Sequence, residues 1–143
     1  MMTNEAREAV VREAMSWLGT PYHHHARVKG VGVDCAQILC AVYETAGVVP
    51  HVDPGTYATD WHLHRHEEMY SHWLLKYASR LGPDEVPFPG DVALFKFGRC
   101  FSHGAIVVED GLLVHSYVNR GVVLSRATEE PLQGREVIYW KLN

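Results

Sequence analysis

Cys35 stands where a cysteine side chain could act as a nucleophile. It follows a glycine-rich loop, residues 29–33, and opens a segment, residues 35–46, in which apolar residues recur at helical spacing. The exposed N–H groups and the positive end of the dipole at a helix start favour the thiolate. A buried cysteine at a helix start is also common without any thiol chemistry, and Asp34 is explained equally well as a helix N-cap. Cys35 therefore indicates catalysis only if the chain also supplies a base.

Two histidines, His103 and His115, are the candidate bases. They lie in neighbouring strands of one predicted hairpin, whereas the other eight histidines lie in loops or on helical patterns. A two-residue turn at the hairpin tip would point the two imidazoles to opposite faces of the sheet. A three-residue loop, 109–111, with Gly111 in the left-handed conformation, would place Ala105 opposite His115 and both imidazoles on one face. A catalytic interpretation therefore predicts the three-residue loop.

In that geometry the role of each side chain follows from its chemistry. His103 takes the thiol proton, and His115 orients and stabilises the imidazolium that results. The backbone N–H of Cys35 is one candidate donor to the oxyanion. The three residues then form a set of nucleophile, base and orienting group.

The elements that must position these residues are helices first and strands second. Helical periodicity and strand alternation predict helices over residues 4–18, 35–46 and about 60–81, and strands over 92–97, 104–109, 112–117, 121–126 and 136–142. We expect a single domain over residues 1–143. Its fold class is α+β, with N-terminal helices packed on a C-terminal antiparallel sheet of about five strands.

Composition excludes several classes of protein. The chain has 143 residues, 47% of them hydrophobic, which suits one ordinary core. A net charge of −4 and the lack of a Lys/Arg cluster argue against a nucleic-acid binder. Three cysteines without CxxC spacing suggest neither a disulfide framework nor a cysteine zinc site. No apolar run approaches membrane-spanning length, and residues 1–10 carry charges, so we expect synthesis in the cytoplasm without an export signal and no membrane partner.

Five short motifs, in this order, resemble the NlpC-type family of papain-like peptidoglycan peptidases. They are Gly19-Thr20-Pro21-Tyr22, Gly32-Val33-Asp34-Cys35, Pro89-Gly90-Asp91-Val92, Ser102-His103-Gly104-Ala105-Ile106-Val107 and Leu113-Val114-His115. The match runs from about residue 19 to residue 123. It is similar in particular to short single-domain versions that phages and gene transfer agents encode as tail-associated cell-wall peptidases. The resemblance implies a papain-like fold, with Cys35 as nucleophile, His103 as base and His115 as the polar third residue, and we expect no cofactor and no metal.

The resemblance also implies a substrate and the residues that bind it. Tyr22 matches a tyrosine at the edge of the active site, and Asp34 matches an aspartate that helps to recognise the free amino end of a stem peptide. The bond cleaved in that family joins D-γ-glutamate to a diamino acid, usually meso-diaminopimelate. The expected partners are therefore the peptidoglycan stem peptide and tail proteins of a phage or gene transfer agent. The expected place of action is the periplasm or cell wall, after delivery by the tail.

The chain departs from the family pattern at two places. Ala36 and Gln37 follow the nucleophile where the family usually has Ser-Gly, so a hydroxyl and a small residue are both absent. This leaves the thiol chemistry intact but puts the recognition of the substrate in question. Residues 57–81 form a longer segment than the expected linker, and either a lid or a docking surface for a tail protein would account for it.

Three alternative functions stay open. A metal-binding protein is motivated by the histidines, although consecutive histidines in a loop do not by themselves converge on an ion; they are His23-His24-His25, His62, His64 and His66. The residues after Cys35 motivate a non-catalytic structural or adaptor protein of a phage tail with the same fold. The same Cys-His pair would also serve an amidase or acyltransferase that acts on a different substrate.

Overall fold

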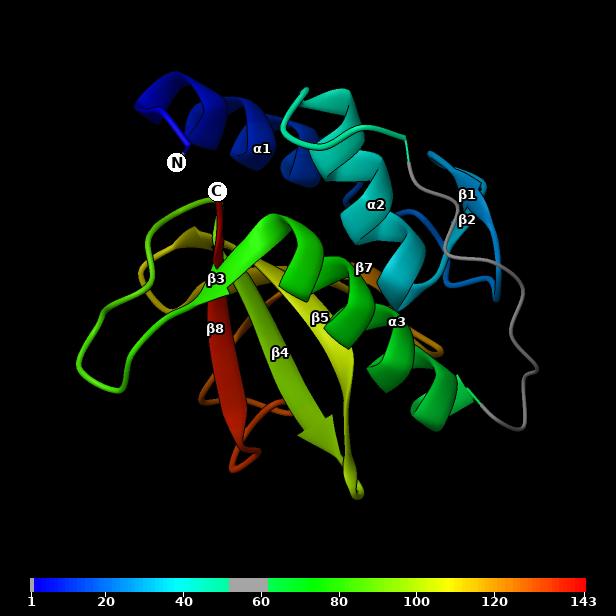
Figure 1. Cartoon of the computed structure of the whole chain (residues 1–143). Helices are drawn as coiled ribbons and strands as arrows, with labels where there is room; N and C mark the ends of the chain where they lie inside the picture. The colour runs from blue at the N-terminus through cyan, green and yellow to red at the C-terminus, as the bar shows by residue number, and fades with distance from the viewer. Residues whose placement is uncertain (1, 52–61) are drawn as a thin grey trace.

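The structure is a computed structural model that describes residues 2–51 and 62–143, with side chains for 2–51 and 70–143. Helices precede the main strands, as predicted (Figure 1). The helices are α1 (Asn4–Ser16), α2 (Cys35–Thr45) and α3 (His62–Tyr77). The strands are β1 (Arg27–Val28), β2 (Gly32–Val33), β3 (Ala78–Arg80), β4 (Val92–Phe97), β5 (Cys100–Glu109), β6 (Leu112–Tyr117), β7 (Gly121–Arg126) and β8 (Val137–Leu142).

Six of the strands form one antiparallel sheet in the order β3-β8-β4-β5-β6-β7, and β1 and β2 pair separately. The prediction of a C-terminal antiparallel sheet is confirmed, and its additional member is β3. We expected the third helix to continue to residue 81, and that is wrong. The helix ends at Tyr77 because the next residues pair with the last strand, Ala78 with Leu142 and Arg80 with Trp140. The expected start of this helix near residue 60 lies outside the described residues.

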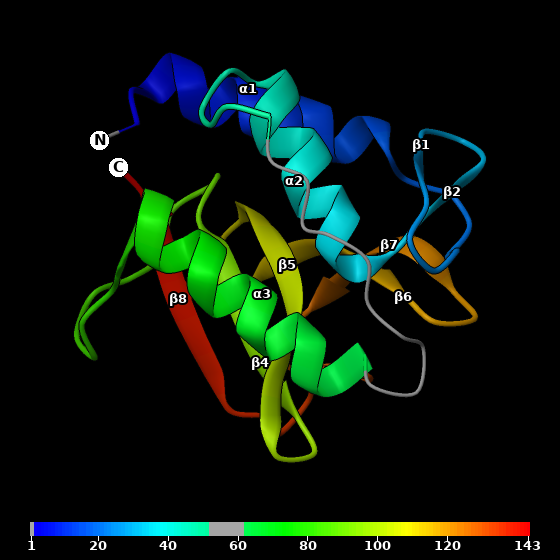
Figure 2. The ribbon, with the colours of Figure 1, turned by 45° about the vertical axis from the view of Figure 1, so that its right-hand side comes forward.

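The helices cover one face of the sheet (Figures 1 and 2). Side chains of β4 alternate between two cores, as the pleat of a strand requires. Val92 and Leu94 face the helices and join the larger core, whereas Ala93 and Phe95 face away and pack with Leu132 in a smaller one. Across the described part of the chain, no helix combines the length and the apolar character that crossing a membrane requires.

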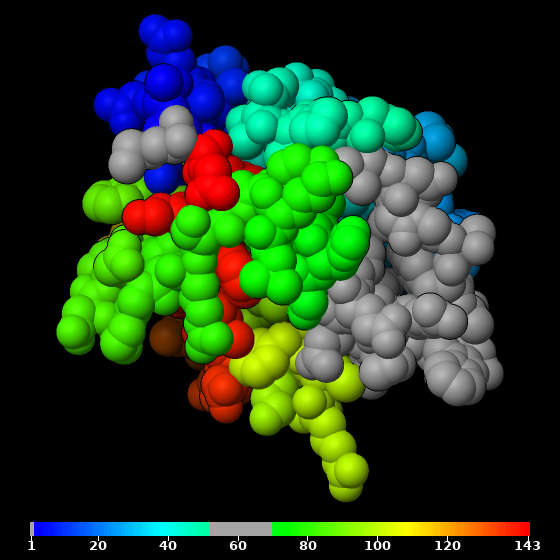
Figure 3. All heavy atoms as spheres, viewed as in Figure 1, coloured from blue at the N-terminus to red at the C-terminus, as the bar shows by residue number. Residues whose placement is uncertain are grey.

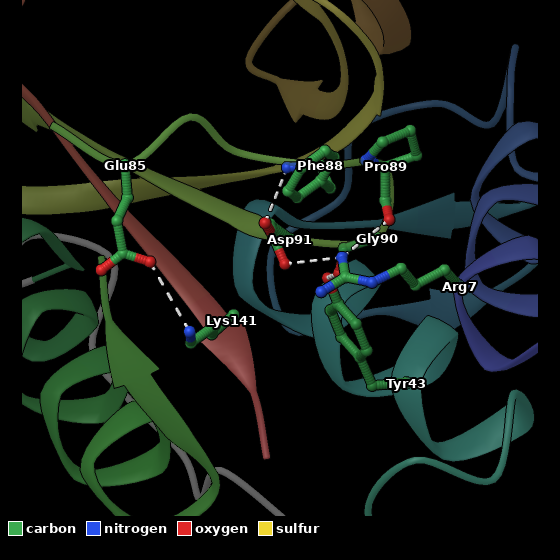
Figure 4. Close-up of polar contacts among 8 residues, drawn as sticks. All are labelled: Arg7, Tyr43, Glu85, Phe88, Pro89, Gly90, Asp91 and Lys141. Carbon is green, nitrogen blue, oxygen red and sulfur yellow. Dashed lines mark hydrogen bonds and ion pairs between the residues drawn. The ribbon is translucent and has the colours of Figure 1, made fainter. Parts of the chain in front are cut away.

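The Pro89-Gly90-Asp91 motif ties the first two helices to the start of β4 (Figure 4). The Arg7 guanidinium of α1 forms an ion pair with Asp91 at 2.8 Å and donates to the carbonyl of Pro89 at 3.0 Å. The Tyr43 hydroxyl of α2 donates to the carbonyl of Gly90 at 2.7 Å. Asp91 is 1% exposed, so its charge needs this partner. This motif therefore stabilises the fold and lies among contacts that hold α1 and α2 in place.

The end of the chain lies beside α3 at the surface, where the space-filling view shows the two in contact (Figure 3). The N–H of Asn143 donates to the carbonyl of Tyr77 at 3.0 Å. Within α3, Tyr70 and Leu74 are 1% and 0% exposed and belong to the main core. These residues pack the second half of α3 into the main core, and residues 57–61 lie outside the described residues.

Candidate active site

Asp34 is the N-cap of α2 and fixes the position of Cys35. Its Oδ1 accepts from the N–H groups of Ala36 at 3.0 Å and Gln37 at 2.8 Å, which satisfies donors that a helix start leaves without intrahelical partners. Its Oδ2 accepts from the N–H of His25 at 2.8 Å. The carboxylate is 0% exposed and is held by backbone donors from both sides. One residue therefore joins the histidine loop to the first turn of the helix that carries the thiol.

The Cys35 thiol is buried, with 4% of the residue exposed, and its Sγ lies 3.9 Å from the carbonyl oxygen of Ser102 in β5. Burial is the main cause that raises the thiol pKa to about 12, and the charge of Asp34 adds to it. Hydrogen bonds from the Tyr70 hydroxyl and from backbone N–H groups act in the opposite direction. In this environment the helix start alone does not produce a thiolate, in contrast to the expectation from the sequence. The thiol is reactive only if a base takes its proton.

The hairpin of β5 and β6 has the register that a catalytic interpretation requires. Ile106 pairs with Val114 and Val107 with Leu113, so the alternation places His115 across from residue 105 and on the same face as residue 103. Gly111 has a φ of 71°, the predicted left-handed conformation. The prediction of a three-residue loop is wrong: Glu109 pairs with Leu112, which leaves a two-residue turn of Asp110 and Gly111. The extra residue that keeps both histidines on one face enters instead as a register shift between 107 and 109.

His103, His115 and Ser125 form a chain of hydrogen bonds across three neighbouring strands. Nε2 of His103 lies 2.7 Å from Nδ1 of His115, and Nε2 of His115 lies 2.8 Å from Oγ of Ser125. His115 is 0% exposed, and burial, with a smaller contribution from the charge of Arg120, lowers its pKa to about 4. His115 is therefore neutral at neutral pH and carries a single ring proton, which it can place toward only one of its two partners.

Cys35 and His103 line the same cavity of about 360 Å³. Its wall contains aromatic, hydroxyl and cationic groups; the other lining residues are Tyr22, Phe97, Gly98, Ser102, Ser116, Tyr117, Val118 and Arg135. The rings of Phe97 and Tyr117 lie 5.0 and 5.6 Å from that of His103, centre to centre, and 6.0 Å from each other, so the three rings pack as one cluster. The structure thus brings the three residues proposed for catalysis to one site, two of them on the cavity wall and His115 directly behind.

Tyr22 reaches this cavity because its backbone forms an isolated parallel bridge with Val33, just before the helix. Burial raises the pKa of its hydroxyl, and the charges of a Cys35 thiolate and of Asp34 raise it further. Tyr22 is therefore a neutral phenol at the cavity wall that can donate a hydrogen bond. Its predicted place at the edge of the site agrees with the geometry, whereas substrate contacts of Tyr22 and Asp34 stay predictions.

Tyr70 is a site residue that the sequence does not reveal. Its hydroxyl accepts from the N–H of Gly104 at 3.1 Å and hydrogen bonds to the Cys35 sulfur. A Cβ on residue 104 would lie 2.9 Å from atoms of both Tyr70 and Leu39, so only glycine allows α3 to approach β5 this closely. In the sequence Tyr70 is one apolar position of a helical pattern, and nothing local distinguishes it from Trp73.

The departure at Gln37 has a structural explanation, whereas Ala36 is simply buried in the main core. The amide oxygen of Gln37 accepts from Nε of Arg27 at 2.8 Å, and the same guanidinium forms an ion pair with Glu44 at 2.7 Å. Gln37 therefore connects β1 to α2 through a side-chain hydrogen bond, which a glycine at this position could not form.

The metal-binding alternative has no site in the described part of the chain. No group of three or more His, Cys, Asp or Glu side chains within residues 2–51 and 70–143 is placed to hold an ion. The rings of His24 and His25 lie 3.9 Å apart, centre to centre, and are tilted by 31° to each other. The side chains of His62, His64 and His66 lie outside the described residues.

No family model and no curated protein sequence matches this chain, whereas solved structures do. The NlpC/p60 domain of the peptidoglycan hydrolase SagA is 19% identical with a TM-score of 0.63, over 92% of this chain and 96% of that one. An NlpC/P60 family protein from Bacillus cereus is 18% identical with a TM-score of 0.66, over 92% of this chain. Only 39% of the Bacillus cereus chain is covered, so this chain spans about two fifths of it.

A third similar structure is RipD from Mycobacterium tuberculosis, a non-catalytic NlpC/p60 domain protein with an adaptation to peptidoglycan-binding function. It is 16% identical with a TM-score of 0.62, over 97% of this chain and 98% of that one. The three comparisons agree in architecture across nearly the whole chain. At these identities the likeness establishes the fold: the chain has the papain-like α+β fold of the NlpC/p60 domains, as its sequence motifs predict.

Proposed function

We propose that this protein is a cysteine hydrolase that cleaves an amide bond in peptidoglycan stem peptides, with Cys35 as nucleophile, His103 as base and His115 as orienting residue. The observation that carries the proposal is the buried chain from His103 through His115 to Ser125, which ends at a cavity that the thiol also lines. The hydrogen bond of 2.7 Å between His103, on the cavity wall beside the thiol, and His115 behind it pairs a base with an orienting group. Together with the fold of peptidoglycan hydrolases, it supports hydrolysis by a thiol.

The protonation of the histidine chain follows from the neutrality of His115. With Nε2 of His103 engaged by His115, Nδ1 of His103 is the nitrogen that takes the thiol proton. Nε2 of His103 then has to carry a proton of its own and donate to Nδ1 of His115, whose remaining proton is on Nε2 and points to Ser125. The Ser125 hydroxyl accepts a hydrogen bond from that N–H and so supports the productive tautomer. The low pKa of His115 keeps it an acceptor throughout.

The reaction proceeds through an acyl-enzyme. His103 removes the proton from Cys35, and the thiolate attacks the scissile carbonyl carbon, with the N–H of Cys35 in the first turn of α2 as one donor to the oxyanion. The C–N bond then breaks as the His103 imidazolium protonates the leaving amine, which leaves a thioester. Water, deprotonated by His103, attacks the thioester, and the C–S bond breaks to release the carboxylic acid. His103 finally returns the proton to the thiolate.

The bond we propose is the one between D-γ-glutamate and a diamino acid. The charge of Asp34 raises the pKa of both Tyr22 and Cys35, so its negative potential reaches the cavity although the carboxylate itself is buried. A negative potential at the cavity wall favours a substrate with a free amino group nearby. This supports recognition of the amino end of a stem peptide, with the Tyr22 hydroxyl as a neutral donor at the same wall.

A non-catalytic peptidoglycan-binding protein is the second candidate. The specific observation in its favour is the burial of Cys35, whose pKa is raised to about 12, on a fold that RipD uses without catalysis. The two candidates differ in the reactivity of the thiol, because a thiolate supplied by His103 alkylates well below the ordinary thiol pKa. A buried thiol without a working base does not.

Defined muropeptides incubated with wild type and with Cys35→Ala, in reducing buffer and followed by mass spectrometry, test the hydrolase. We expect cleavage between D-γ-glutamate and the diamino acid by wild type and none by Cys35→Ala. Cleavage at another amide would indicate the amidase or acyltransferase alternative. Intact peptides with both proteins, at high enzyme concentration, would contradict hydrolysis.

Alkylation by iodoacetamide, mapped to each cysteine by peptide mass, tests the thiol without any substrate. It distinguishes a protein without a reactive thiol from an enzyme that was offered the wrong peptide. We expect Cys35 to react at neutral pH in wild type and much more slowly in His103→Gln. Cys100, which is partly exposed and outside the histidine chain, is the internal control and should react equally in both proteins.

We also propose that the protein acts in the cell wall after delivery by the tail of a phage or gene transfer agent. The order and spacing of its motifs support this setting through their resemblance to such tail peptidases. Proteomic detection of this chain in purified tail particles from its host, at a fixed ratio to the other tail proteins, tests the proposal.

A further inference from the structure

Arg135 is a cationic side chain on the wall of the active-site cavity that the mechanism above does not use. It lies in the loop before β8, far in sequence from the motifs that contain Cys35 and the histidines. Among the described residues that line this cavity it is the one with a permanent charge. The proposed chemistry needs a nucleophile, a base and an orienting residue, so this arginine requires another explanation.

The guanidinium of Arg135 is held in a fixed orientation. Its central carbon lies 3.6 Å from the centre of the Phe97 ring, which is the distance of a stacked pair. Its Nε donates to the carbonyl of Pro131 at 2.7 Å. Among the residues that the structure describes, its two terminal nitrogens have no hydrogen-bond or ion-pair partner. The side chain is therefore oriented on one face and one edge, with the donors of its outer edge still available.

Phe97 connects this guanidinium to the catalytic base. The same ring that stacks on Arg135 lies 5.0 Å from the ring of His103, so the cation and the imidazole pack against one aromatic side chain. A planar, half-buried guanidinium with paired donors binds a carboxylate in two parallel hydrogen bonds. An anion bound there would lie close to the carbonyl that the thiol attacks.

We propose that Arg135 binds a carboxylate of the substrate that flanks the scissile amide. This inference rests on the proposed function and specifies the substrate class of the same site. A glutamate joined through its γ-carboxyl keeps its α-carboxylate as a branch two methylenes from the reacting carbonyl. A diaminopimelate on the leaving side keeps a second carboxylate of its own. Arg135 recognises one of these two branches, and the cavity thereby discriminates between stem peptides that carry it as an acid and those that carry it as an amide.

Three synthetic stem peptides distinguish the two sources of the carboxylate. The reference contains D-γ-glutamate followed by meso-diaminopimelate, the second has D-isoglutamine in place of the glutamate, and the third has L-lysine in place of the diaminopimelate. We expect Arg135→Gln to lower kcat/KM on the reference peptide about tenfold, as for the loss of one charge-assisted contact at a partly exposed site. It should leave unchanged kcat/KM on whichever modified peptide lacks the recognised carboxylate.

Two further variants keep the test specific. Arg135→Lys retains the charge without the paired donors and should recover part of the preference for the acid. Arg120→Gln is the matched control, because Arg120 stacks on Tyr117 of the cavity wall at 5.8 Å but does not line the cavity. It removes one positive charge nearby and should not change the ratio of acid to amide turnover. A drop in that ratio equal to that of Arg135→Gln would show a general field effect and overturn the proposal.

The outcomes separate this inference from the proposed function. If wild type cleaves the peptides and Arg135→Gln slows all three equally, the carboxylate proposal is wrong and the hydrolase stands. If wild type cleaves none of them, the hydrolase proposal fails. The affinities of the same peptides for Cys35→Ala, measured by calorimetry, then show whether Arg135 binds a carboxylate. A preference of about tenfold for the acid that Arg135→Gln removes supports carboxylate recognition, and equal affinities for acid and amide overturn it.

Discussion

His115 is a buried histidine whose neutrality determines how its neighbours can act. A cationic imidazolium at a position with 0% exposure would be strongly unfavourable, and the lowered pKa of about 4 expresses this. A neutral ring has one donor and one acceptor nitrogen, so its two partners, His103 and Ser125, cannot both accept from it. When Nδ1 of His115 accepts from His103, the Ser125 hydroxyl accepts from Nε2–H of His115 and so supports the ring proton on the side away from His103.

Replacing Ser125 tests the role of its hydroxyl as the hydrogen-bond acceptor for His115. Ser125→Ala removes the acceptor at 2.8 Å and leaves a ring nitrogen unpaired in a buried site, so we expect a loss of about 1–3 kcal/mol in the free energy of unfolding. The productive tautomer also loses its support, and kcat should fall about five- to tenfold with KM unchanged, on the order of 1 kcal/mol in the barrier. Ser125→Thr keeps the hydroxyl and should restore kcat. Equal kcat in Ser125→Ala and wild type, measured on muropeptides across pH, would contradict the role.

The sequence predicts Cys35, His103 and His115 as site residues because each is marked by a local pattern. Ser125 could have been found by extending the same register reasoning by one strand. His115 pairs with Val123, and residue 125 is the diagonal neighbour on the same face. Tyr70 could not have been found in this way, since its place beside the thiol results from the packing of α3 on β5.

At the scale of elements, the β5–β6 hairpin shows that a register can be predicted more securely than a turn. The predicted face of both histidines is confirmed, yet the extra residue lies at a shift between 107 and 109 instead of in the loop. The reason is that burial on both faces of the sheet constrains the pairing of the strands, while the exposed tip can place one surplus residue in more than one way. Local turn chemistry required only that Gly111 be left-handed, and it is.

Substitutions of Gly111 should therefore change the free energy of unfolding without changing catalysis. Its φ of 71° is a conformation that a Cβ disfavours, and the space around it is open, since the nearest atom lies 3.9 Å from the position that a Cβ would take. We expect Gly111→Ala to lower the free energy of unfolding by about 1 kcal/mol, and Gly111→Asn by less, because asparagine tolerates this conformation better. Urea unfolding of both variants measures the difference.

The activity of the same variants supplies the control for Gly111. The register from residue 107 inward is set by buried pairing and not by the tip, so kcat of folded Gly111→Ala should equal that of wild type. A variant that is fully folded but inactive would show that the turn determines the position of His115.

At the scale of the molecule, the site assembles groups from segments that meet only in the folded chain. The thiol comes from the start of α2, the histidines from adjacent strands, and Arg135 from the loop that precedes β8. The motifs predicted the fold because they mark the helix start and the strand pair, which the NlpC/p60 structures share. The edge strand β3 was not predicted, because its residues continue the apolar spacing of α3 and only pairing with β8 reveals it. Long-range pairing of this kind has no local signature in the sequence.

The free energy of unfolding depends on pH through His115, because its pKa differs between the folded and the unfolded protein. The pKa of this imidazole is about 4 in the folded protein and has its ordinary value of 6.5 in the unfolded chain. Between these values the unfolded chain binds more protons, so the contribution of His115 is complete above pH 6.5 and is lost as the pH falls toward 4. Acidification from about pH 7.5 to about pH 4.5 should therefore cost wild type about 2–3 kcal/mol through this residue.

A variant without a titratable group at residue 115 separates the pH effect of His115 from that of the Asp and Glu side chains. His115→Gln should be less stable than wild type at about pH 7.5, because it loses buried hydrogen bonds, but the gap in the free energy of unfolding should narrow by about 2 kcal/mol at about pH 4.5. His72→Gln, at an exposed position on α3, serves as the matched control and should follow wild type at both pH values. Urea titrations of the three proteins measure the gap. A gap that stays constant with pH would mean that the pKa of His115 is the same in the folded and the unfolded protein, which would contradict its lowering by burial.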